Sequence, residues 1–526
     1  MKFFDKIFKR NNSNRQKNQN NQVLFIPDFD TYDEFGQIIS IFDYVLNPDL
    51  EIANKATHAV HRLFKTVQLY KNNQLYKAFR FLRVNISEIE KFKRFEMEVE
   101  ITLLCISSMN SNGYTREKAL DRLIQLQTPR SIPFILFRMA DWVLPIRKKA
   151  ENTIQTLLVQ ENAIYFIQNY KLINWLLRVE RNDISEFYNM IVRYFTANRI
   201  SSDQLSQLND NERFYYYILL TKKSEMISEF VPQMINDKYY LIRLLLVSHL
   251  NSLANGKEIL SQLLLDKSQK VRLYAINLIS NHELTDYQEI LENLIYDKST
   301  SVRIEARRLI GKICIIDFIE KYRIGLLKKQ LLVGSILGLS EVSDRNEINT
   351  LVKYLDSEIP NVRTASLIGI FNLDHEFGLK KAYEILENKN PISIKRAAEN
   401  ILLKQGIDFQ RLRILYDITD QIGKVIILRL FNKFRNWSSA GDFLKAIAEK
   451  NERIEFIARV FLDSWRGYTI RLGTRPTNED KEYVLYWYNK ANMLGIRVPS
   501  DIPFIFGEKL NETIKHNYEL KYPEIY

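Results

Sequence analysis

The sequence predicts an all-α protein, an α-solenoid in which antiparallel helical hairpins of about 31 residues stack into a right-handed superhelix. Three observations indicate this fold class. With 526 residues, the chain is too long for one compact hydrophobic core. Only 16 Gly and 12 Pro occur, so helical segments have few breaks. A short phrase recurs at near-constant spacing, which is typical of an array of similar units.

The recurring phrase is an Asp or Asn, four further residues, an aliphatic residue, a basic residue, and a small residue three positions later. The clearest copies start at Asp141, Asp266 and Asp297, and the copy at Asp237 has a Leu at the small position. In chain order the copies pair Asn47 with Ala53, Asn110 with Arg116, Asp141 with Arg147, Asp237 with Arg243, Asp266 with Arg272, Asp297 with Arg303 and Asp356 with Arg363, and Lys395 follows without an Asp.

The basic positions of neighbouring copies lie 29 to 32 residues apart, or about two or three times that distance where a copy is missing. We expect the missing units near Arg213, Leu332 and Glu455. The repeat array therefore occupies residues 25–465. Its copies are degenerate at about 150–235, where irregular curvature or a break is expected.

A unit of about 31 residues accommodates two helices of three to four turns and two short turns. In the segment 296–315, Val302, Ala306 and Leu309 lie at helical spacing and form one apolar face. Ser299 and Thr300 precede this face and are candidates for the N-cap of the helix. The phrase therefore marks the start of the second helix of each hairpin.

This phrase resembles the one that opens the second helix in the HEAT repeat family, and the resemblance covers roughly four-fifths of the chain. In that family the Asp and Arg side chains form a ladder between adjacent repeats. The resemblance therefore implies a structural role for Asp141, Arg147, Asp237, Arg243, Asp266, Arg272, Asp297, Arg303 and Arg363.

The two ends of the chain differ from the array. Residues 1–24 form a basic tail, expected to be flexible, whose first ten residues are amphipathic and could contact an anionic membrane surface. Residues 466–526 are expected to form a C-terminal helical cap, with a helix opening at about 478–481. Large side chains such as Trp465, Tyr486, Trp487 and Phe506 would cover the end of the array.

Composition favours a cytoplasmic location, with a peripheral position at the inner face of the membrane as an alternative. No apolar stretch is long enough to predict a transmembrane segment, and the N-terminus lacks the pattern of a secretory signal. The net charge of +12 is partly due to the basic tail. Outside that tail the charge balance is ordinary for the size of the chain and is weak evidence for a nucleic-acid partner.

Familiar catalytic motifs, including a phosphate-binding loop and a His-Glu-x-x-His helix, are absent from the sequence. His58 and His61 lack the carboxylate or Cys that would complete a metal site, and Cys105 and Cys314 are interpreted as buried free thiols. We therefore expect no cofactor, no metal and no enzymatic activity. Bilin lyases and helical-repeat DNA glycosylases are enzyme classes with HEAT-like folds, but no motif of either matches residue by residue.

These observations predict a non-catalytic scaffold or adaptor that binds protein partners, acidic ones included, through the concave face formed by the second helices. The residues expected to contact an acidic partner are Lys149, Tyr274, Arg308, Lys312, Arg396 and Lys404. A nucleic-acid-binding or DNA-repair protein is the first alternative, since basic residues recur on these helices. An adaptor tethered to the inner membrane surface by residues 1–10 is the second.

Overall fold

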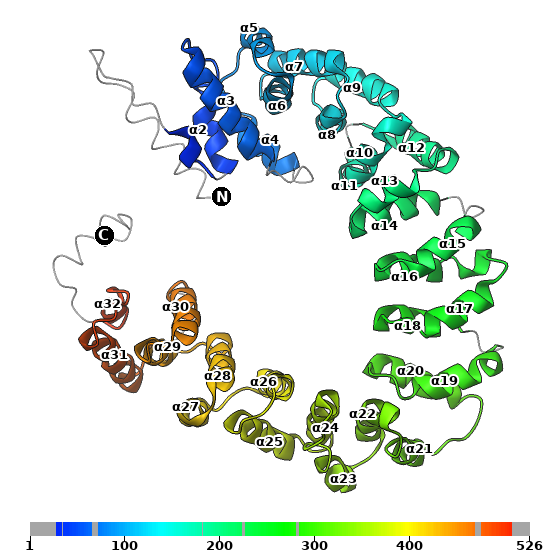
Figure 1. Ribbon diagram of the computed structural model, residues 1–526, viewed down its shortest axis with the longest axis vertical. Helices are drawn as coiled ribbons and strands as arrows, with labels where there is room; N and C mark the ends of the chain where they lie inside the picture. The colour runs from blue at the N-terminus through cyan, green and yellow to red at the C-terminus, as the bar shows by residue number, and fades with distance from the viewer. Residues whose placement is uncertain are drawn as a thin grey trace. The chain divides into compact units, whose positions relative to one another are not determined.

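The computed structural model describes residues 28–33, 35–65, 72–180, 182–222, 227–279, 283–468 and 475–507. All regular secondary structure in these ranges is helical, so the all-α prediction is confirmed there (Figure 1). The basic tail at residues 1–24 lies outside them, as does its amphipathic segment 1–10. None of the helices in the described ranges is both long and apolar enough to cross a membrane.

The chain divides into two compact units, Met1–Ile259 and Leu260–Tyr526. The α-helices of the first unit, of which the last extends across the boundary, are α2 (Ile38–Phe42), α3 (Leu50–Lys65), α4 (Asn72–Phe79), α5 (Ile86–Ile89), α6 (Met97–Ser107), α7 (Gly113–Leu126), α8 (Ile132–Arg138), α9 (Leu144–Thr156), α10 (Ala163–Gln168), α11 (Tyr170–Leu176), α12 (Ser185–Ala197), α13 (Ser202–Gln207), α14 (Asp210–Leu220), α15 (Ile227–Asn236), α16 (Tyr240–Val247) and α17 (Gly256–Leu264).

The α-helices of the second unit are α18 (Gln269–Ile276), α19 (Gln288–Leu294), α20 (Thr300–Ile310), α21 (Phe318–Gly325), α22 (Leu332–Val342), α23 (Ile348–Val352), α24 (Pro360–Leu373), α25 (His375–Glu387), α26 (Ile392–Gln405), α27 (Phe409–Ile418), α28 (Gln421–Lys433), α29 (Ser439–Ala448), α30 (Glu452–Arg466), α31 (Asn478–Met493) and α32 (Ile502–Ile505).

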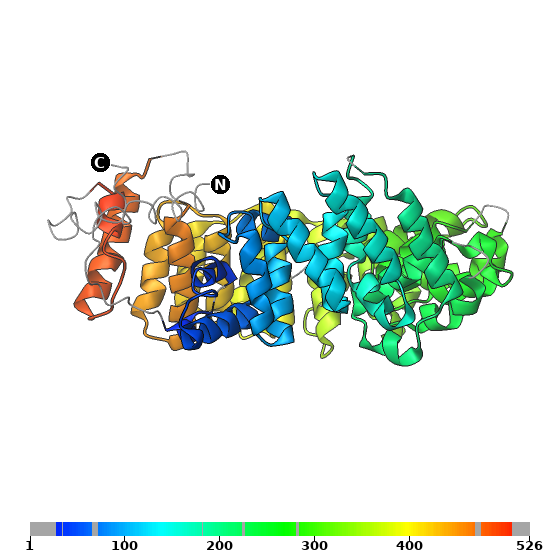
Figure 2. The same ribbon diagram turned by 90° about the horizontal axis from the view of Figure 1, so that it is seen from above.

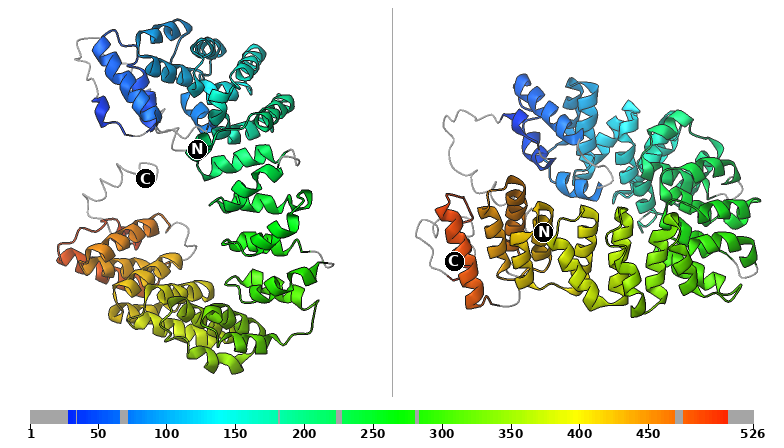
Figure 3. Two further views of the ribbon diagram at one scale, coloured as in Figure 1. Left: turned by 45° about the vertical axis from the view of Figure 1, so that its right-hand side comes forward. Right: turned by 60° about the horizontal axis from the view of Figure 1, so that its bottom comes forward.

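Helices that are neighbours in the sequence pack against one another in both units. In the first unit these pairs include α6 with α7, α8 with α9 and α15 with α16, and α7 also contacts α9. The blue to cyan helices of this unit stand side by side in Figure 2. In the second unit α18, α20, α22, α24, α26, α28 and α30 contact one another in succession, and the right-hand view of Figure 3 shows this row in green to orange.

The helix α20 shows why the repeat phrase produces a helix start. Val302, Ala306 and Ile310 are fully buried along one face. Ser299 is the N-cap residue, but its side chain makes no capping hydrogen bond, contrary to the sequence-based expectation. The Asp297 carboxylate accepts the Ser299 N–H instead, at 2.7 Å. The Asp of the phrase therefore satisfies a main-chain donor that the helix leaves free.

The segment that the sequence marks as degenerate contains several short helices, including α10, α11 and α13, which span six or seven residues each. Consecutive tyrosines fill its interior: Tyr216 and Tyr217 are buried, and the Tyr215 ring stacks on Tyr170 with centroids 4.9 Å apart. Three consecutive tyrosines, Tyr215 to Tyr217, could suggest a surface that stacks on nucleic-acid bases. Tyr216 and Tyr217 cannot have this role, because their rings are buried.

At the C-terminal end, α31 begins at Asn478, where the sequence predicts a helix start, and packs against α29. The Trp465 and Phe506 rings stack with centroids 6.0 Å apart and are both buried. Tyr486, also expected to cover the end of the array, is instead 57% exposed. Large aromatic side chains therefore close this end of the second unit, with Tyr486 as the exception.

Candidate partner-binding site

A repeated hydrogen-bond arrangement joins the second helices of adjacent hairpins. Arg272 on α18 donates to the main-chain carbonyl of Asp266 in its own repeat, at 2.6 Å. Its Nε and Nη2 also donate to the two carboxylate oxygens of Asp297 in the next repeat, each at 2.7 Å. Because Asp297 also caps the start of α20, one guanidinium fixes the positions of two successive second helices.

The same arrangement occurs in the first unit. Arg116 donates to the Asn110 carbonyl at 3.0 Å and to both oxygens of Asp141 at 2.8 Å. Arg213 on α14 donates to the carboxylate of Asp237 at 2.9 and 3.0 Å. In each pair the basic residue lies 24 or 25 positions before its Asp partner.

Several predicted ladder residues make the hydrogen bond within their own repeat. Arg147, Arg243 and Arg363 donate to the carbonyls of Asp141, Asp237 and Ser357, which precede their own helices. Arg303, fully buried, donates to the Asp297 carbonyl and pairs with Glu341 in place of an Asp. The ladder therefore tolerates substitution of its acidic member.

Sequence reasoning did not assign ladder partners to Arg116, Arg213 and Lys395. Lys395 is fully buried and its Nζ lies 2.8 Å from Asp420. The sequence signal for these three residues is a basic side chain 24 or 25 positions before an Asp. This signal does not require that the repeat of the basic residue itself begins with an Asp.

The six residues predicted to contact a partner lie on or just after second helices. Lys149 on α9 belongs to the first unit, and its Nζ already pairs with Glu117 at 2.9 Å and Asp121 at 2.6 Å. The other five belong to the second unit. The Arg308 side chain on α20 pairs with Glu305 of the same helix. These two cations are therefore already paired within the chain.

The remaining four predicted contact residues are exposed. Tyr274 lies on α18, Arg396 and Lys404 lie on α26, and Lys312 lies in the turn after α20. The structure thus gives the second helices of the second unit an exposed aromatic and several exposed cations.

A separate cleft opens in the first unit, between α4, α8 and α11. Its volume is about 460 Å³, and four of its lining residues are the aromatics Tyr76, Phe137, Trp142 and Trp175. The Phe137 and Trp175 rings stack, with centroids 5.6 Å apart and planes 14° apart. The Tyr76 ring continues this row at 6.0 Å from Phe137, whereas Trp142 is 69% exposed. The cleft therefore has an aromatic wall of the kind that binds flat apolar groups.

Charged side chains also line the cleft, namely Arg138, Asp141, Arg178 and Glu180. Arg178 and Glu180 are exposed, whereas Arg138 is only 2% exposed. The Arg138 guanidinium lies 4.7 Å from the centroid of the Phe137 ring and donates from Nη1 to Asp141 at 2.8 Å. Burial lowers the pKa of Arg138 to about 10, so the group stays charged at neutral pH.

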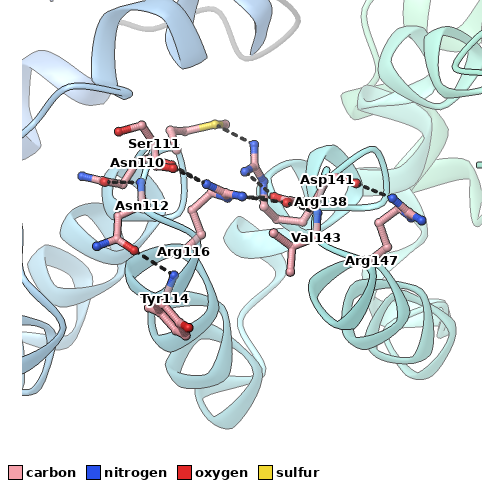
Figure 4. A network of polar contacts seen from close by, with 10 residues as sticks. Asn110, Ser111, Asn112, Tyr114, Arg116, Arg138, Asp141, Val143 and Arg147 are labelled. Carbon is pink, nitrogen blue, oxygen red and sulfur yellow. Dashed lines mark hydrogen bonds and ion pairs between the residues drawn. The ribbon is translucent and has the colours of Figure 1, made fainter. Parts of the chain in front are cut away.

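Asp141 accepts hydrogen bonds from two guanidinium groups, those of Arg116 and Arg138, and from the N–H of Val143 at the start of α9 (Figure 4). Burial by itself would raise the pKa of Asp141, but the two guanidinium groups outweigh it and the pKa is lowered. One carboxylate thus serves two buried cations, and this network carries one excess positive charge.

Arg138 was not identified from the sequence, although a signal was present. It lies three residues before Asp141, and the equivalent positions before Asp237, Asp266 and Asp297 are the buried apolar residues Met234, Leu263 and Leu294. A charged residue at a position that elsewhere belongs to the core is the kind of local inconsistency that often marks a functional site.

The other candidates from the sequence remain isolated side chains. His61 hydrogen-bonds Thr102, with Nδ1 and Oγ1 2.7 Å apart. Cys105 is buried, whereas Cys314 is only partly buried, so the prediction of two buried thiols is wrong for Cys314. Within the described ranges, no group of three His, Cys, Asp or Glu side chains is arranged to hold a metal ion.

No protein-family model matches the chain, and no curated protein shows significant sequence similarity to it.

Proposed function

We propose that the chain is a non-catalytic scaffold that binds protein partners through the exposed faces of HEAT-like second helices. In this proposal the hairpins continue as an α-solenoid with a right-handed superhelical twist, and the second helices line its concave side. The partner is acidic, because exposed cations accompany apolar side chains on these helices.

The observation that carries the proposal is the arginine ladder. An arginine such as Arg272 holds its own helix start and the Asp that opens the next second helix. This link supports a fixed register between successive helices, so their exposed residues form a preorganised surface. Preorganised surfaces bind partners with a smaller loss of conformational entropy.

A nucleic-acid partner is the alternative, and the test has to distinguish it from a protein partner. The pairing of Lys149 with Glu117 and Asp121, and of Arg308 with Glu305, weakens the case for a nucleic-acid partner. Phosphate recognition depends on unneutralised Lys and Arg side chains, and each internal ion pair removes one of them.

The test is affinity capture of the tagged full-length protein from its native cells, with and without nuclease. The informative variant combines Arg396→Ala and Lys404→Ala on the second helix α26. The control combines Lys329→Ala and Lys380→Ala, which remove two exposed cations from outside the second helices of the same unit.

We expect a protein that stays bound after nuclease treatment, is lost from the Arg396 and Lys404 variant, and is retained by the control. Association that disappears with nuclease would contradict the proposal and favour nucleic-acid binding. Equal loss from both variants would show that net charge, not the second-helix surface, is responsible.

A further inference from the structure

The aromatic cleft of the first unit has the features of a binding site that differs from the second-helix surface. We propose that this cleft binds a linear peptide in which an aromatic side chain lies next to a Glu or Asp side chain. The inference rests on the proposed scaffold function, since it specifies the chemistry of one peptide that such a scaffold would hold.

The first argument is the charge of the cleft. Asp141 is shared by Arg116 and Arg138, so the buried network has one positive charge more than it has negative charges. The other two charged lining residues, Arg178 and Glu180, are exposed and contribute one charge of each sign. A buried charge without a counter-charge is costly, and a carboxylate from a ligand would supply one.

The second argument is the hydrogen-bonding capacity of Arg138. Its Nη1 donates to Asp141 and its Nη2 to the sulfur of Met109, a weak acceptor, at 3.6 Å. Its Nε is buried without a hydrogen-bond partner. Asp141 already accepts from four donors, so Arg138 has unused donor capacity at the buried end of the cleft, whereas the Asp141 carboxylate has no lone pair left to accept another hydrogen bond.

The third argument is that the fold does not require a charge at position 138. Met234 occupies the equivalent position before Asp237 and is fully buried there. The Asp141 carboxylate would keep its bidentate partner Arg116 if position 138 were apolar. The chain therefore retains a desolvated guanidinium at a place where a hydrophobic residue supports the same helix start.

The aromatic wall determines the other half of the ligand. Phe137, Trp175 and Tyr76 form a continuous row, and Trp142 is exposed beside it. A cavity of about 460 Å³ is at the small end of ligand clefts, which suits one or two side chains rather than a whole helix. Aromatic rings also bind cations, but the excess positive charge here disfavours a cationic ligand.

The probes are blocked eight-residue peptides with Glu-Phe or Glu-Trp at the centre and neutral Gly and Ser flanks. Matched peptides carry Gln in place of Glu. The chain has five tryptophans, of which only Trp142 and Trp175 lie in the first unit. Labelling with 5-fluorotryptophan therefore lets fluorine NMR report on the cleft and on the second unit within one sample, with Trp→Phe variants assigning the signals.

We expect saturable shifts of the Trp142 and Trp175 signals with the Glu peptides, and at least about tenfold weaker binding of the Gln peptides. Loss of a hydrogen bond to a charged group has this order of effect. Arg138→Met should weaken binding of the Glu peptides to the level of the Gln peptides. Trp142→Ala changes an exposed side chain, so it tests the site without disturbing the core, whereas Tyr486→Ala in the second unit should change nothing.

The inference is overturned if the two signals do not shift, if Glu and Gln peptides bind equally, or if folded Arg138→Met binds like the original chain. It is also overturned if a single-stranded oligonucleotide shifts these signals and no peptide does, which would assign the cleft to nucleic acid. Failure here is distinguishable from failure of the scaffold proposal, because that proposal is tested by capture through Arg396 and Lys404 in the second unit.

Discussion

Asp141 accepts hydrogen bonds from Arg116, Arg138 and the Val143 N–H while being almost fully buried. Asp141→Asn keeps an oxygen that can cap Val143 but removes the negative charge that both guanidinium groups need. Leaving buried charges uncompensated typically costs about 3–5 kcal/mol. We therefore expect the free energy of unfolding of the first unit to fall by about this amount in urea denaturation.

Asp237→Asn is the matched control, because Asp237 also caps a second helix but pairs with a more exposed arginine, Arg213. Its cost should be clearly smaller. Equal costs for the two variants would mean that the second buried guanidinium, Arg138, does not depend on Asp141.

The same carboxylate predicts a pH dependence with a defined sign. The pKa of Asp141 is lowered in the folded protein, where the two guanidinium groups outweigh the effect of burial. An unfolded Asp has a pKa of about 3.9. The stabilisation is therefore fully present above about pH 4 and is lost as the pH falls towards the lowered value. The measurement is the urea midpoint of the original chain and of Asp141→Asn between pH 6 and pH 3. The difference between the two midpoints should become smaller as the pH falls. A difference that stays constant would contradict a lowered pKa of Asp141 as its cause.

At the scale of elements, α22 approaches the chain before α20 so closely that only glycine fits. A Cβ on Gly334 would lie 1.8 Å from the main-chain oxygen of Tyr296. Gly334→Ala must therefore push α22 away from Tyr296, and overpacking of this kind costs about 1–3 kcal/mol or more. Thermal or urea unfolding of the second unit measures the loss.

Gly467→Ala provides the comparison, since its Cβ would lie 3.8 Å from the nearest atom and its backbone is right-handed helical. That variant should be neutral or slightly more stable, because Ala restricts the unfolded chain. If both glycine variants lose the same stability, close approach of α22 is not the cause.

The starts of second helices could be predicted from the sequence because the capping contact is local. Asp297 bonds the N–H only two residues later, so the phrase carries its own structural cause. The partner of Arg213 is Asp237, 24 residues later in the next repeat. This pairing can be predicted only when neighbouring copies of the phrase are compared, because a single copy does not contain both residues. The cleft could not be predicted at all, because Tyr76, Phe137 and Trp175 come from three helices whose packing no local pattern encodes.

At the scale of the whole molecule, the row of second helices in the second unit implies that stability is distributed between neighbours. The second helices α20, α22, α24, α26 and α28 each contact the second helix before them and the one after them. In repeat arrays, stability is approximately a sum of intrinsic and nearest-neighbour contributions, so a local defect affects adjacent repeats most.

Asp420→Asn tests this property. The variant keeps an oxygen that can cap Gly423 at the start of α28 but removes the partner of the fully buried Lys395 on α26. Hydrogen exchange measured by mass spectrometry should therefore accelerate in α26 and α28 and stay unchanged in α20 of the same unit. The amide groups of α20 serve as the internal control, since α22 and α24 lie between that helix and α26 in the row. Uniform acceleration from α20 to α30 would show instead that the second unit unfolds as one cooperative block, and the nearest-neighbour description would then be wrong.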